Sequence, residues 1–254
     1  MRTLEGKIAV VTGGARGLGV AYVGALAAAG AHVAVADIED GEPLARELST
    51  AHPGVTVIAS RTDVSDESAV RSFVDAVVAR HGRIDILVNN AAIFSSLDAV
   101  DTDQLDVELW DRVMAVNIRG PFLMCKHVSP VMKRQKGGKV INISSGVAYK
   151  GMRRMLHYAT SKGAMLAFTR SLARELGDWN INVNTVAPGL ILSDSIAANS
   201  KHIEDFRAPV IASRALKRDG YPRDLVGTLL FLASDASDFI TGQTIAVDGG
   251  SVNT

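Results

Sequence analysis

The chain has 254 residues, and its 27 lysines and arginines balance 27 aspartates and glutamates, so the formal net charge at pH 7 is zero. Without an excess of positive charge, nucleic acid is not expected as the main partner. One cysteine, Cys125, excludes an intrachain disulfide and a cysteine-rich zinc site. The longest apolar stretch, residues 23–36, is interrupted at Gly30 and is too short to span a bilayer. We therefore expect a soluble, cytoplasmic protein with no membrane partner.

Short β-branched runs alternate along the chain with patterns typical of helices. Most runs are apolar throughout, as strands covered on both faces must be, so the sheet should be parallel. The expected strands are 8–12, 32–37, 55–60, 84–90, 139–144, 181–187 and 244–248. Repeated strand–helix units predict one α/β domain over residues 1–254, a doubly wound Rossmann-type sheet of about seven strands with helices on both faces. Residues 188–221 are the least regular and predict a long loop at the substrate.

A glycine-rich turn, TGGARGLG at residues 12–19, follows the first strand and opens a helix. Its spaced glycines are Gly13, Gly17 and Gly19. Glycine allows positive φ and lets the backbone approach a pyrophosphate at the positive end of a helix. Asp37 ends the second strand, where its carboxylate can accept hydrogen bonds from both ribose hydroxyls and would repel a 2′-phosphate. Arg16 could instead pair with a 2′-phosphate. An acid at the ribose should outweigh a loop arginine, so the sequence predicts NAD rather than NADP.

Tyr158 and Lys162 lie four residues apart at the start of a helix expected over 158–177, so their side chains share one face. A phenol titrates near ~10, too high for a base at neutral pH. An ammonium ~5 Å away, at an effective dielectric of ~20, would favour the phenolate by roughly 3 kcal/mol, or about two pKa units. We therefore expect Lys162 to make Tyr158 a workable proton acceptor, with a serine hydroxyl nearby to hold the substrate oxygen.

The motifs occur in the order found in the short-chain dehydrogenase/reductases, and the chain resembles that family over nearly its whole length. The resemblance is carried by TGGARGLG (12–19), NNAA (89–92), Asn117, the Ser–Tyr–Lys set, Pro188–Gly189 and FITGQTIAVDGG (239–250). It implies that Tyr158 is the general acid/base and that Lys162 lowers its pKa and holds the nicotinamide ribose. The family serine lies thirteen residues before the tyrosine, which selects Ser145. Asn117 is implied to order a water that connects Lys162 to bulk solvent.

The resemblance also assigns the cofactor-binding residues. Asp63 and Val64 resemble the pair at the adenine, and residues 89–91 resemble the turn beside the cofactor. The set of expected cofactor contacts is Gly13, Arg16, Gly17, Leu18, Gly19, Asp37, Asp63, Val64, Asn90, Ala91, Ala92, Tyr158, Lys162, Pro188, Gly189, Ile191 and Ser193. The chain departs from the family pattern in two minor ways. NNAA replaces the commoner NNAG, and Ser193 stands where threonine is usual but keeps the hydroxyl.

Tyr149 and Arg153 have the same spacing as Tyr158 and Lys162, but Gly151 lies between them and no apolar helical pattern follows. A guanidinium also stays charged and cannot join a proton relay as an ammonium can. We therefore expect Tyr149 to be a pocket or surface residue.

Ser144 and His157 are the other competitors in this stretch. Adjacent residues of a strand point to opposite faces, so Ser144 should point away from the site if Ser145 points into it. His157 precedes Tyr158 and faces elsewhere on the helix, so it is a pocket-wall residue at most. The other histidines are scattered, and no metal site is expected.

The substrate pocket implied by the resemblance is apolar. Together with Ser145 and Tyr158, the expected lining residues are Ile93, Phe94, Val147, Met152, Met155, Leu156, Leu190 and Ile191. Flexible methionines suit a mid-sized alicyclic or aromatic secondary alcohol or ketone. Arg153 and Arg154 complicate this, because either could hold a carboxylate, although a solvated surface is the simpler interpretation.

The sequence thus predicts an NAD-dependent short-chain alcohol dehydrogenase that acts on a small molecule. An NADP-dependent ketoreductase of the 3-oxoacyl-carrier-protein type is an alternative that Asp37 disfavours, because those members of the family mostly use NADP. A lyase or epimerase on the same fold would produce no net NADH, and a non-catalytic sensor should lack part of the catalytic set. The family is commonly tetrameric, so a homotetramer is expected.

Overall fold

The computed structural model describes residues 3–197 and 200–252. One seven-stranded parallel sheet has the order β3-β2-β1-β4-β5-β6-β7. The strands are β1 (Ile8–Thr12), β2 (His32–Asp37), β3 (Val57–Arg61), β4 (Ile86–Asn89), β5 (Gly138–Ile143), β6 (Ile181–Pro188) and β7 (Thr244–Val247). This confirms the predicted doubly wound α/β sheet, and the strand ends differ from the expected ones by at most two residues.

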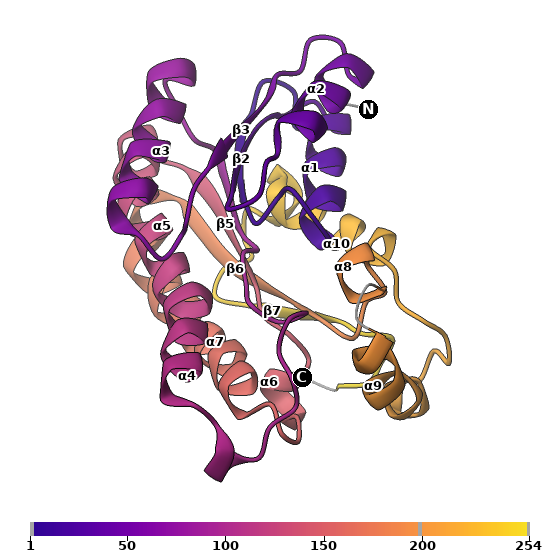
Figure 1. Ribbon diagram of the computed structural model, residues 1–254. Helices are drawn as coiled ribbons and strands as arrows, with labels where there is room; N and C mark the ends of the chain where they lie inside the picture. Colours follow the sequence, from indigo (N-terminus) through magenta and orange to yellow (C-terminus); the bar gives the residue numbers. More distant parts are fainter. Residues whose placement is uncertain (1–2, 198–199, 253–254) are drawn as a thin grey trace.

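Helices cover both faces of the sheet (Figure 1). One face carries α1 (Leu18–Ala28), α2 (Glu42–Ala51) and α10 (Arg223–Ala233), and the other carries α3 (Glu67–His81), α5 (Gly120–Gln135) and α7 (Leu156–Leu176). The shorter helices are α4 (Val107–Met114), α6 (Val147–Lys150), α8 (Asp194–Ala197) and α9 (Ser200–Ser213), with 3-10 turns η1 (Thr102–Gln104), η3 (Gly177–Trp179) and η4 (Asp235–Ser237). A π-helix, η2 (Ala115–Arg119), joins α4 to α5. Within the described ranges, no helix has the length and apolar character of a membrane span.

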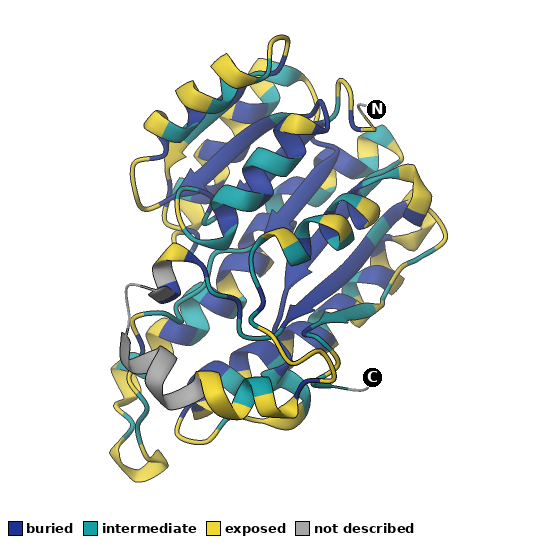
Figure 2. Ribbon diagram, turned by 90° about the vertical axis from the view of Figure 1, so that its right-hand side faces the viewer, coloured by how far each residue is buried: buried dark blue, intermediate teal, exposed yellow. Residues whose placement is uncertain are grey.

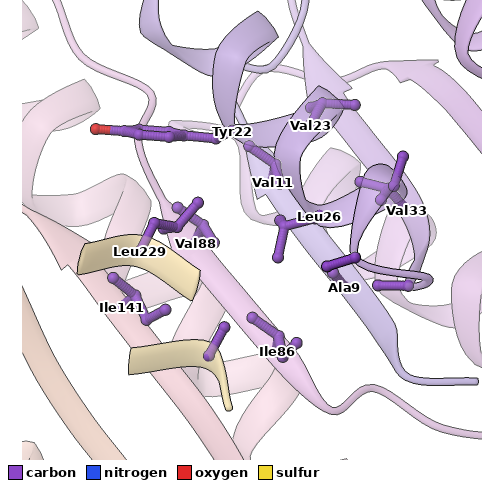
Figure 3. Packing of buried hydrophobic residues seen from close by; sticks show 14 of the residues in the cluster. Ala9, Val11, Tyr22, Val23, Leu26, Val33, Ile86, Val88, Ile141 and Leu229 are labelled. Carbon is purple, nitrogen blue, oxygen red and sulfur yellow. The ribbon is translucent and has the colours of Figure 1, made fainter. Parts of the chain in front are cut away.

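Successive side chains of each strand point to opposite faces of the sheet, so the hydrophobic core forms two layers. In β1, Ala9 and Val11 pack toward α1 and α10, whereas Ile8 and Val10 pack toward α3 and α5. Figure 3 shows the first layer, where Tyr22 of α1 and Leu229 of α10 lie over the strands. The central strands are therefore buried on both sides, as Figure 2 shows, whereas the edge strands β3 and β7 are partly exposed. This explains why their sequences are apolar throughout rather than alternating.

The segment 188–221 is largely helical, so the prediction of a long loop there is wrong. It contains α8 and α9, and a proline inside α9 at position 209 interrupts the pattern that would have indicated a helix. Its two ends are tied together, because Leu192 N donates to Gly220 O at 2.8 Å. The buried guanidinium of Arg214 also donates to Leu190 O and Arg218 O, each at 2.6 Å.

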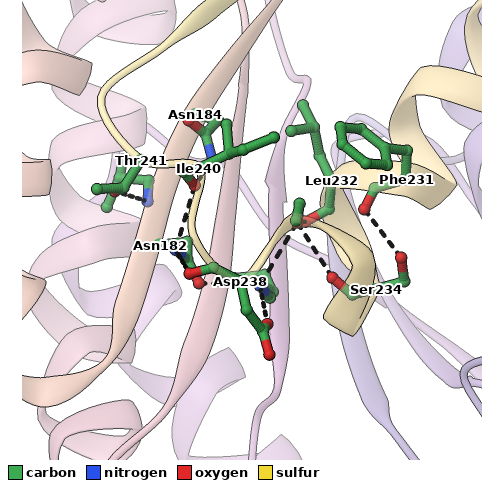
Figure 4. Close-up of polar contacts among 11 residues, drawn as sticks. Asn182, Asn184, Phe231, Leu232, Ser234, Asp238, Ile240 and Thr241 are labelled. Carbon is green, nitrogen blue, oxygen red and sulfur yellow. Dashed lines mark hydrogen bonds and ion pairs between the residues drawn. The ribbon is translucent and has the colours of Figure 1, made fainter.

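Side-chain amides fasten the segment between α10 and β7 to the edge of the sheet (Figure 4). Asn182 Nδ2 donates to Asp238 O at 2.9 Å and to Ile240 O at 3.1 Å, and Asn184 Nδ2 donates to Ile240 O at 2.7 Å. Strand β7 then pairs with β6 as far as Pro188 opposite Val247. These contacts position the chain that leaves β6 at Pro188 and enters the candidate site.

Candidate active site

A pocket of about 1070 Å³ runs along the carboxyl ends of the strands. Its walls include the turns after β1 and β4, the two strands at which the strand order reverses direction. Ligands of doubly wound sheets bind at such a switch point. The pocket joins the glycine-rich turn, Asp37, Ser145, Tyr158 and Lys162 in one continuous space. Residues separated in the sequence by more than a hundred positions therefore meet around one cavity.

The glycine-rich turn has the shape of an anion cradle. Gly13 adopts φ +62°, and a Cβ there would lie 2.8 Å from Ala91 Cα. Gly17 caps the N-terminus of α1 at φ 57°, with no side-chain cap and no acid in the first turn, so the positive end of the helix keeps its donors for a ligand. Gly17 lines the pocket with Arg16 and Leu18.

Gly19 is buried and does not line the pocket wall, so its expected contact with the cofactor stays a prediction. A Cβ at Gly19 would lie only 2.0 Å from Gly13 O, which no side chain could tolerate. Gly19 is required because α1 packs directly against the turn, and this packing sets the direction of the helix end.

Asp37 is held as an acceptor on the pocket wall. Its Oδ2 accepts from Ala15 N at 2.8 Å and its Oδ1 accepts from Glu39 N at 3.0 Å. The side chain is buried, yet it lines the pocket beside the glycine-rich turn. Two backbone donors therefore fix the carboxylate at the end of β2, where the sequence predicted a ribose contact.

The turn after β4 lies directly across from the glycine-rich turn. Asn90 Nδ2 donates to Thr12 O at 3.0 Å and to Gly13 O at 2.8 Å, while Thr12 Oγ1 accepts from Asn90 N and Ala91 N at 3.0 Å each. Thr12 is a positioning residue that sequence reasoning missed, although it stands at the start of the motif. The predicted residues Asp63, Val64, Asn90, Ala91 and Ala92 all line the pocket.

Helix α7 presents Tyr158 and Lys162 to the pocket, and both are buried. Lys162 Nζ lies 5.8 Å from the centre of the Tyr158 ring and donates to Ile143 O at 2.8 Å. Ser145 also lines this part of the pocket, and its Oγ lies 3.4 Å from Pro188 O. The three side chains predicted to form the catalytic set therefore meet in one place.

Burial, rather than the charge of Lys162, is the main influence on the pKa of Tyr158. Burial raises the pKa of Tyr158 above its usual value of 10, and only a hydrogen bond with Ser145 opposes this. Burial also lowers the pKa of Lys162 to about 8, which reduces the positive charge available to act on its neighbour. Desolvation acts against the charged form of both groups, and this opposes the attraction expected from their distance alone.

Ser144 and Tyr149 are the alternative candidates to Ser145 and Tyr158, and their contacts differ from those of the catalytic set. Ser144 Oγ donates to Lys162 O at 2.7 Å and so fixes α7 to the end of β5, although Ser144 also touches the pocket. Tyr149 lies outside the pocket and lines a separate hollow with Arg170 and Thr241. His157 is buried and does not line the pocket either.

Asn117 is buried in the π-helix η2, behind the wall of the pocket. Its Oδ1 accepts from Ile93 N at 2.8 Å, and its Nδ2 donates to Ser161 Oγ at 3.0 Å. Ser161 Oγ in turn donates to Tyr158 O at 2.8 Å. The side chain of Asn117 thus links the turn after β4 to the tyrosine helix, and Ser161 is a second positioning residue that sequence reasoning missed. The water relay implied for Asn117 stays a prediction.

The substrate end of the pocket is largely apolar. Phe94 stacks on Tyr158 with ring centroids 4.4 Å apart, and Ile93, Val147, Met152 and Leu190 also line this region. Two expected lining residues do not reach it. Met155 is fully buried beneath the wall, in a cluster with Leu97, Val113 and Tyr158, and Leu156 points outward with 42% of its surface exposed.

The chain after β6 closes the other side. Its predicted residues Pro188, Gly189, Ile191 and Ser193 all line the pocket. A Cβ at Gly189 would lie 2.8 Å from Asp248 Cβ, so glycine allows the segment to pass close to the end of β7. The wall also contains Ile196, Pro209, Val210 and Ser213, which were not predicted because they belong to the unpredicted helices α8 and α9.

Cys125 is buried on α5, and burial raises the pKa of its thiol to about 12, which is typical of an unreactive core cysteine. In the part of the chain that the structure describes, no group of three or more His, Cys, Asp or Glu side chains could hold a metal ion.

Comparisons with known proteins agree with the fold. A family described as enoyl-(acyl carrier protein) reductase matches residues 13–252. The 2-dehydro-3-deoxy-D-gluconate 5-dehydrogenase of Dickeya dadantii is 37% identical over 248 residues, which cover 97% of this chain and 96% of that protein. A 3-oxoacyl-(acyl-carrier-protein) reductase of Thermotoga maritima is 38% identical over 251 residues, covering 98% and 99%.

The same relationship is found among solved structures. A short-chain type dehydrogenase/reductase from Mycobacterium ulcerans matches with a TM-score of 0.92 at 32% identity, covering 98% of this chain and 90% of that one. Sequence and structure therefore agree over nearly the whole chain. The protein belongs to the short-chain dehydrogenase/reductase family and is an oxidoreductase that binds a nicotinamide cofactor.

Proposed function

We propose that the protein transfers a hydride between NAD and the carbinol or carbonyl carbon of a mid-sized, largely apolar secondary alcohol or ketone. The observation that carries this proposal is that Tyr158 and Lys162 share one continuous pocket with the glycine-rich turn and Asp37. A proton-transfer group and a dinucleotide-shaped cradle are thereby placed on the same ligand path.

The cradle fits the cofactor. The uncapped N-terminus of α1 offers donors for a pyrophosphate, and a side chain at Gly13 would collide with Ala91. The choice of NAD over NADP rests on Asp37, whose carboxylate is held on the wall by Ala15 N and Glu39 N. A fixed, buried negative charge would repel a 2′-phosphate, whereas the exposed Arg16 is free to turn toward solvent.

The chain's own residues carry the proton chemistry. Ser145 and Tyr158 hold the substrate oxygen, and Tyr158 takes the proton from the hydroxyl during oxidation and returns it during reduction. Lys162 holds the neighbouring ribose and passes the proton onward. NAD⁺, when bound, supplies the acceptor for the hydride and a positive ring that favours the phenolate. Because burial raises the pKa of Tyr158, the phenol carries its proton at neutral pH, as its role as the acid in reduction requires.

The substrate class rests on the walls of the pocket. Phe94 stacks on the catalytic tyrosine, and Met152 and Leu190 add apolar surface that can adapt its shape to a ring. The relatives are named for a sugar acid and for an acyl group on a carrier protein, so substrates differ within the family.

The alternative functions have less support. Asp37 disfavours an NADP-dependent ketoreductase of the 3-oxoacyl-carrier-protein type, and a lyase or epimerase would use the same residues without net NADH formation. A sensor would not need Ser145, Tyr158 and Lys162 in one pocket.

We also infer a homotetramer. Large apolar side chains are exposed on two regions, with Val107 and Phe122 on α4 and α5 and with Phe231 and Phe239 near β7. Such surfaces are typical of subunit contacts. Light scattering after size exclusion should give about four times the mass of one chain, and Phe239→Asp should reduce that mass. A cytoplasmic location stays a prediction.

The experiment that tests the function is a panel of cyclic and aryl secondary alcohols offered with NAD⁺ or NADP⁺ and followed by the absorbance of the reduced cofactor. We expect NAD⁺ to give the higher kcat/KM on every active alcohol. A preference for NADP⁺ throughout would mean that Asp37 has been misassigned, and activity confined to sugars or acyl thioesters would contradict the substrate class.

A further inference from the structure

Several basic side chains surround the substrate end of the pocket, beside its apolar wall. Lys150, at the end of α6, and Arg153 and Arg154, between α6 and α7, line it within five consecutive residues. Asp248 is the acid that lines the same end, and two backbone donors, Gly250 N and Ser251 N, already bind its Oδ1. The charges that a substrate meets there are mostly positive.

We propose that Arg153 binds a carboxylate on the substrate, so that the enzyme acts on apolar secondary alcohols or ketones that carry an acid group. This inference rests on the proposed function and narrows its substrate class. The sequence left open whether Arg153 or Arg154 contacts the substrate, and the structure distinguishes the two.

Arg154 is held in place by residues 100 and 101 through both its backbone and its side chain. Val100 N donates to Arg154 O at 2.8 Å, and Arg154 Nε lies 3.4 Å from Asp101 Oδ1. Arg154 also adopts φ 62°, and Gly151 adopts φ 71°, which shapes a tight turn ahead of α7. The charge of Arg154 is therefore engaged by an acid of the chain itself.

Lys150 has a partner too. Its Nζ donates to Ser251 Oγ at 2.6 Å, and Ser251 Oγ also lies 2.5 Å from Ser213 Oγ. This contact draws the ammonium toward the C-terminal segment and α9. Lys150 is thus a rim residue that joins two parts of the wall.

Arg153 differs from both neighbours. Among the residues whose side chains the structure describes, Arg153 forms no ion pair and donates no side-chain hydrogen bond, although it lines the pocket. It follows Met152, an apolar wall residue, and precedes Tyr158 by five positions, so it belongs to the same short stretch as the catalytic tyrosine. Arg153 is exposed and therefore accessible, and a guanidinium presents a planar fork of donors that matches a carboxylate.

Binding of matched probes tests this directly, without turnover. Benzoate and benzamide have nearly the same shape and differ in charge, and their Kd values can be measured by calorimetry in the presence and absence of NADH. We expect wild type to bind benzoate at least about tenfold more tightly than benzamide, and Arg153→Gln to lose most of that preference. Arg153→Lys should keep part of it, and Arg154→Gln should keep nearly all of it.

Salt provides a second readout, because an exposed ion pair is screened as ionic strength rises. The preference for benzoate should decrease between 50 mM and 500 mM salt in wild type and should not change in Arg153→Gln. A wild type that does not discriminate the two probes would overturn the proposal, as would an Arg153→Gln variant that keeps the full preference.

Kinetics separate this inference from the proposed function. The pair is 4-(1-hydroxyethyl)benzoate and 1-phenylethanol, each with NAD⁺. We expect a higher kcat/KM for the acid in wild type, and the ratio of the two values should fall about tenfold in Arg153→Gln through the KM of the acid. Oxidation of both alcohols at equal kcat/KM would overturn the role of Arg153 and leave the proposed function intact. Failure to oxidise either alcohol, together with an intact preference for benzoate, would contradict the proposed function alone.

Discussion

The ring of Phe94 stacks on the ring of Tyr158, with centroids 4.4 Å apart and planes inclined by 28°. Phe94 comes from the turn after β4 and Tyr158 from α7, so this contact joins the cofactor side of the pocket to the catalytic helix. It also contributes to the burial that raises the pKa of Tyr158.

Removing this cover should make the tyrosine easier to ionise. In Phe94→Ala, water reaches the phenol, so its pKa should fall toward the usual value and the acid limb of the oxidation profile should move to lower pH by up to about one unit. Measurement of kcat/KM from pH 6 to 10 checks this. Phe94→Leu keeps an apolar cover and should shift less, whereas a shift to higher pH in Phe94→Ala would contradict the role of burial.

Asp37 should control the choice of cofactor. Asp37→Ala removes two possible hydrogen bonds to the ribose and a charge that repels a 2′-phosphate, so the Kd of NAD⁺ should rise by about ten- to a hundredfold and that of NADP⁺ should not. Calorimetric titration measures both. Glu39→Ala is the matched control, because Glu39 is an exposed acid two residues away that lies outside the pocket. Equal NAD⁺ affinity in Asp37→Ala and wild type would show that the ribose contact is misassigned.

Lys162 should make stability depend on pH. Burial lowers its pKa to about 8 from 10.5, so between these values the unfolded chain binds more protons than the folded one. The free energy of unfolding should therefore rise with pH across this window, by at most about 3 kcal/mol, and the rise should be absent in Lys162→Met.

Urea unfolding at pH 7.5, 8.5 and 9.5 measures this effect as the difference between wild type and Lys162→Met, because the titration of the buried Cys125 thiol, whose pKa is also shifted, is common to both proteins. Lys217→Met, at an exposed lysine, should keep the rise of the wild type. Parallel pH dependences in wild type and Lys162→Met would contradict a depressed pKa at position 162.

The sequence predicts an element of the structure where a local pattern, such as an apolar run or a glycine position, is enough to specify it. The strands were predictable because burial on both faces requires continuous apolar runs, and the residues of the cofactor turn were predictable because glycine and acid positions there follow from backbone geometry. The helices α8 and α9 were not, since Pro209 interrupts the pattern and no single apolar stripe marks them.

The predicted site was incomplete where a side chain's direction depends on tertiary packing. Met155 lies within the apolar stretch before Tyr158, but it turns into the core with Leu97 and Val113. Thr12 and Ser161 act through hydrogen bonds to distant segments, and sequence spacing does not reveal such contacts. The pKa of Tyr158 was misjudged because burial, unlike the distance to Lys162, cannot be read from spacing on a helix.

The most direct test of the account is the activity of Tyr158→Phe beside Tyr149→Phe, measured with NAD⁺ and the best alcohol of the panel. Tyr149 has the same spacing to a cation but lies outside the pocket. We expect Tyr158→Phe to lose about a thousandfold in kcat/KM while its Kd for NADH stays within threefold of wild type, and we expect Tyr149→Phe to stay near wild type. A Tyr158→Phe enzyme that keeps more than a tenth of the activity would contradict the assignment of Tyr158 as the proton-transfer group.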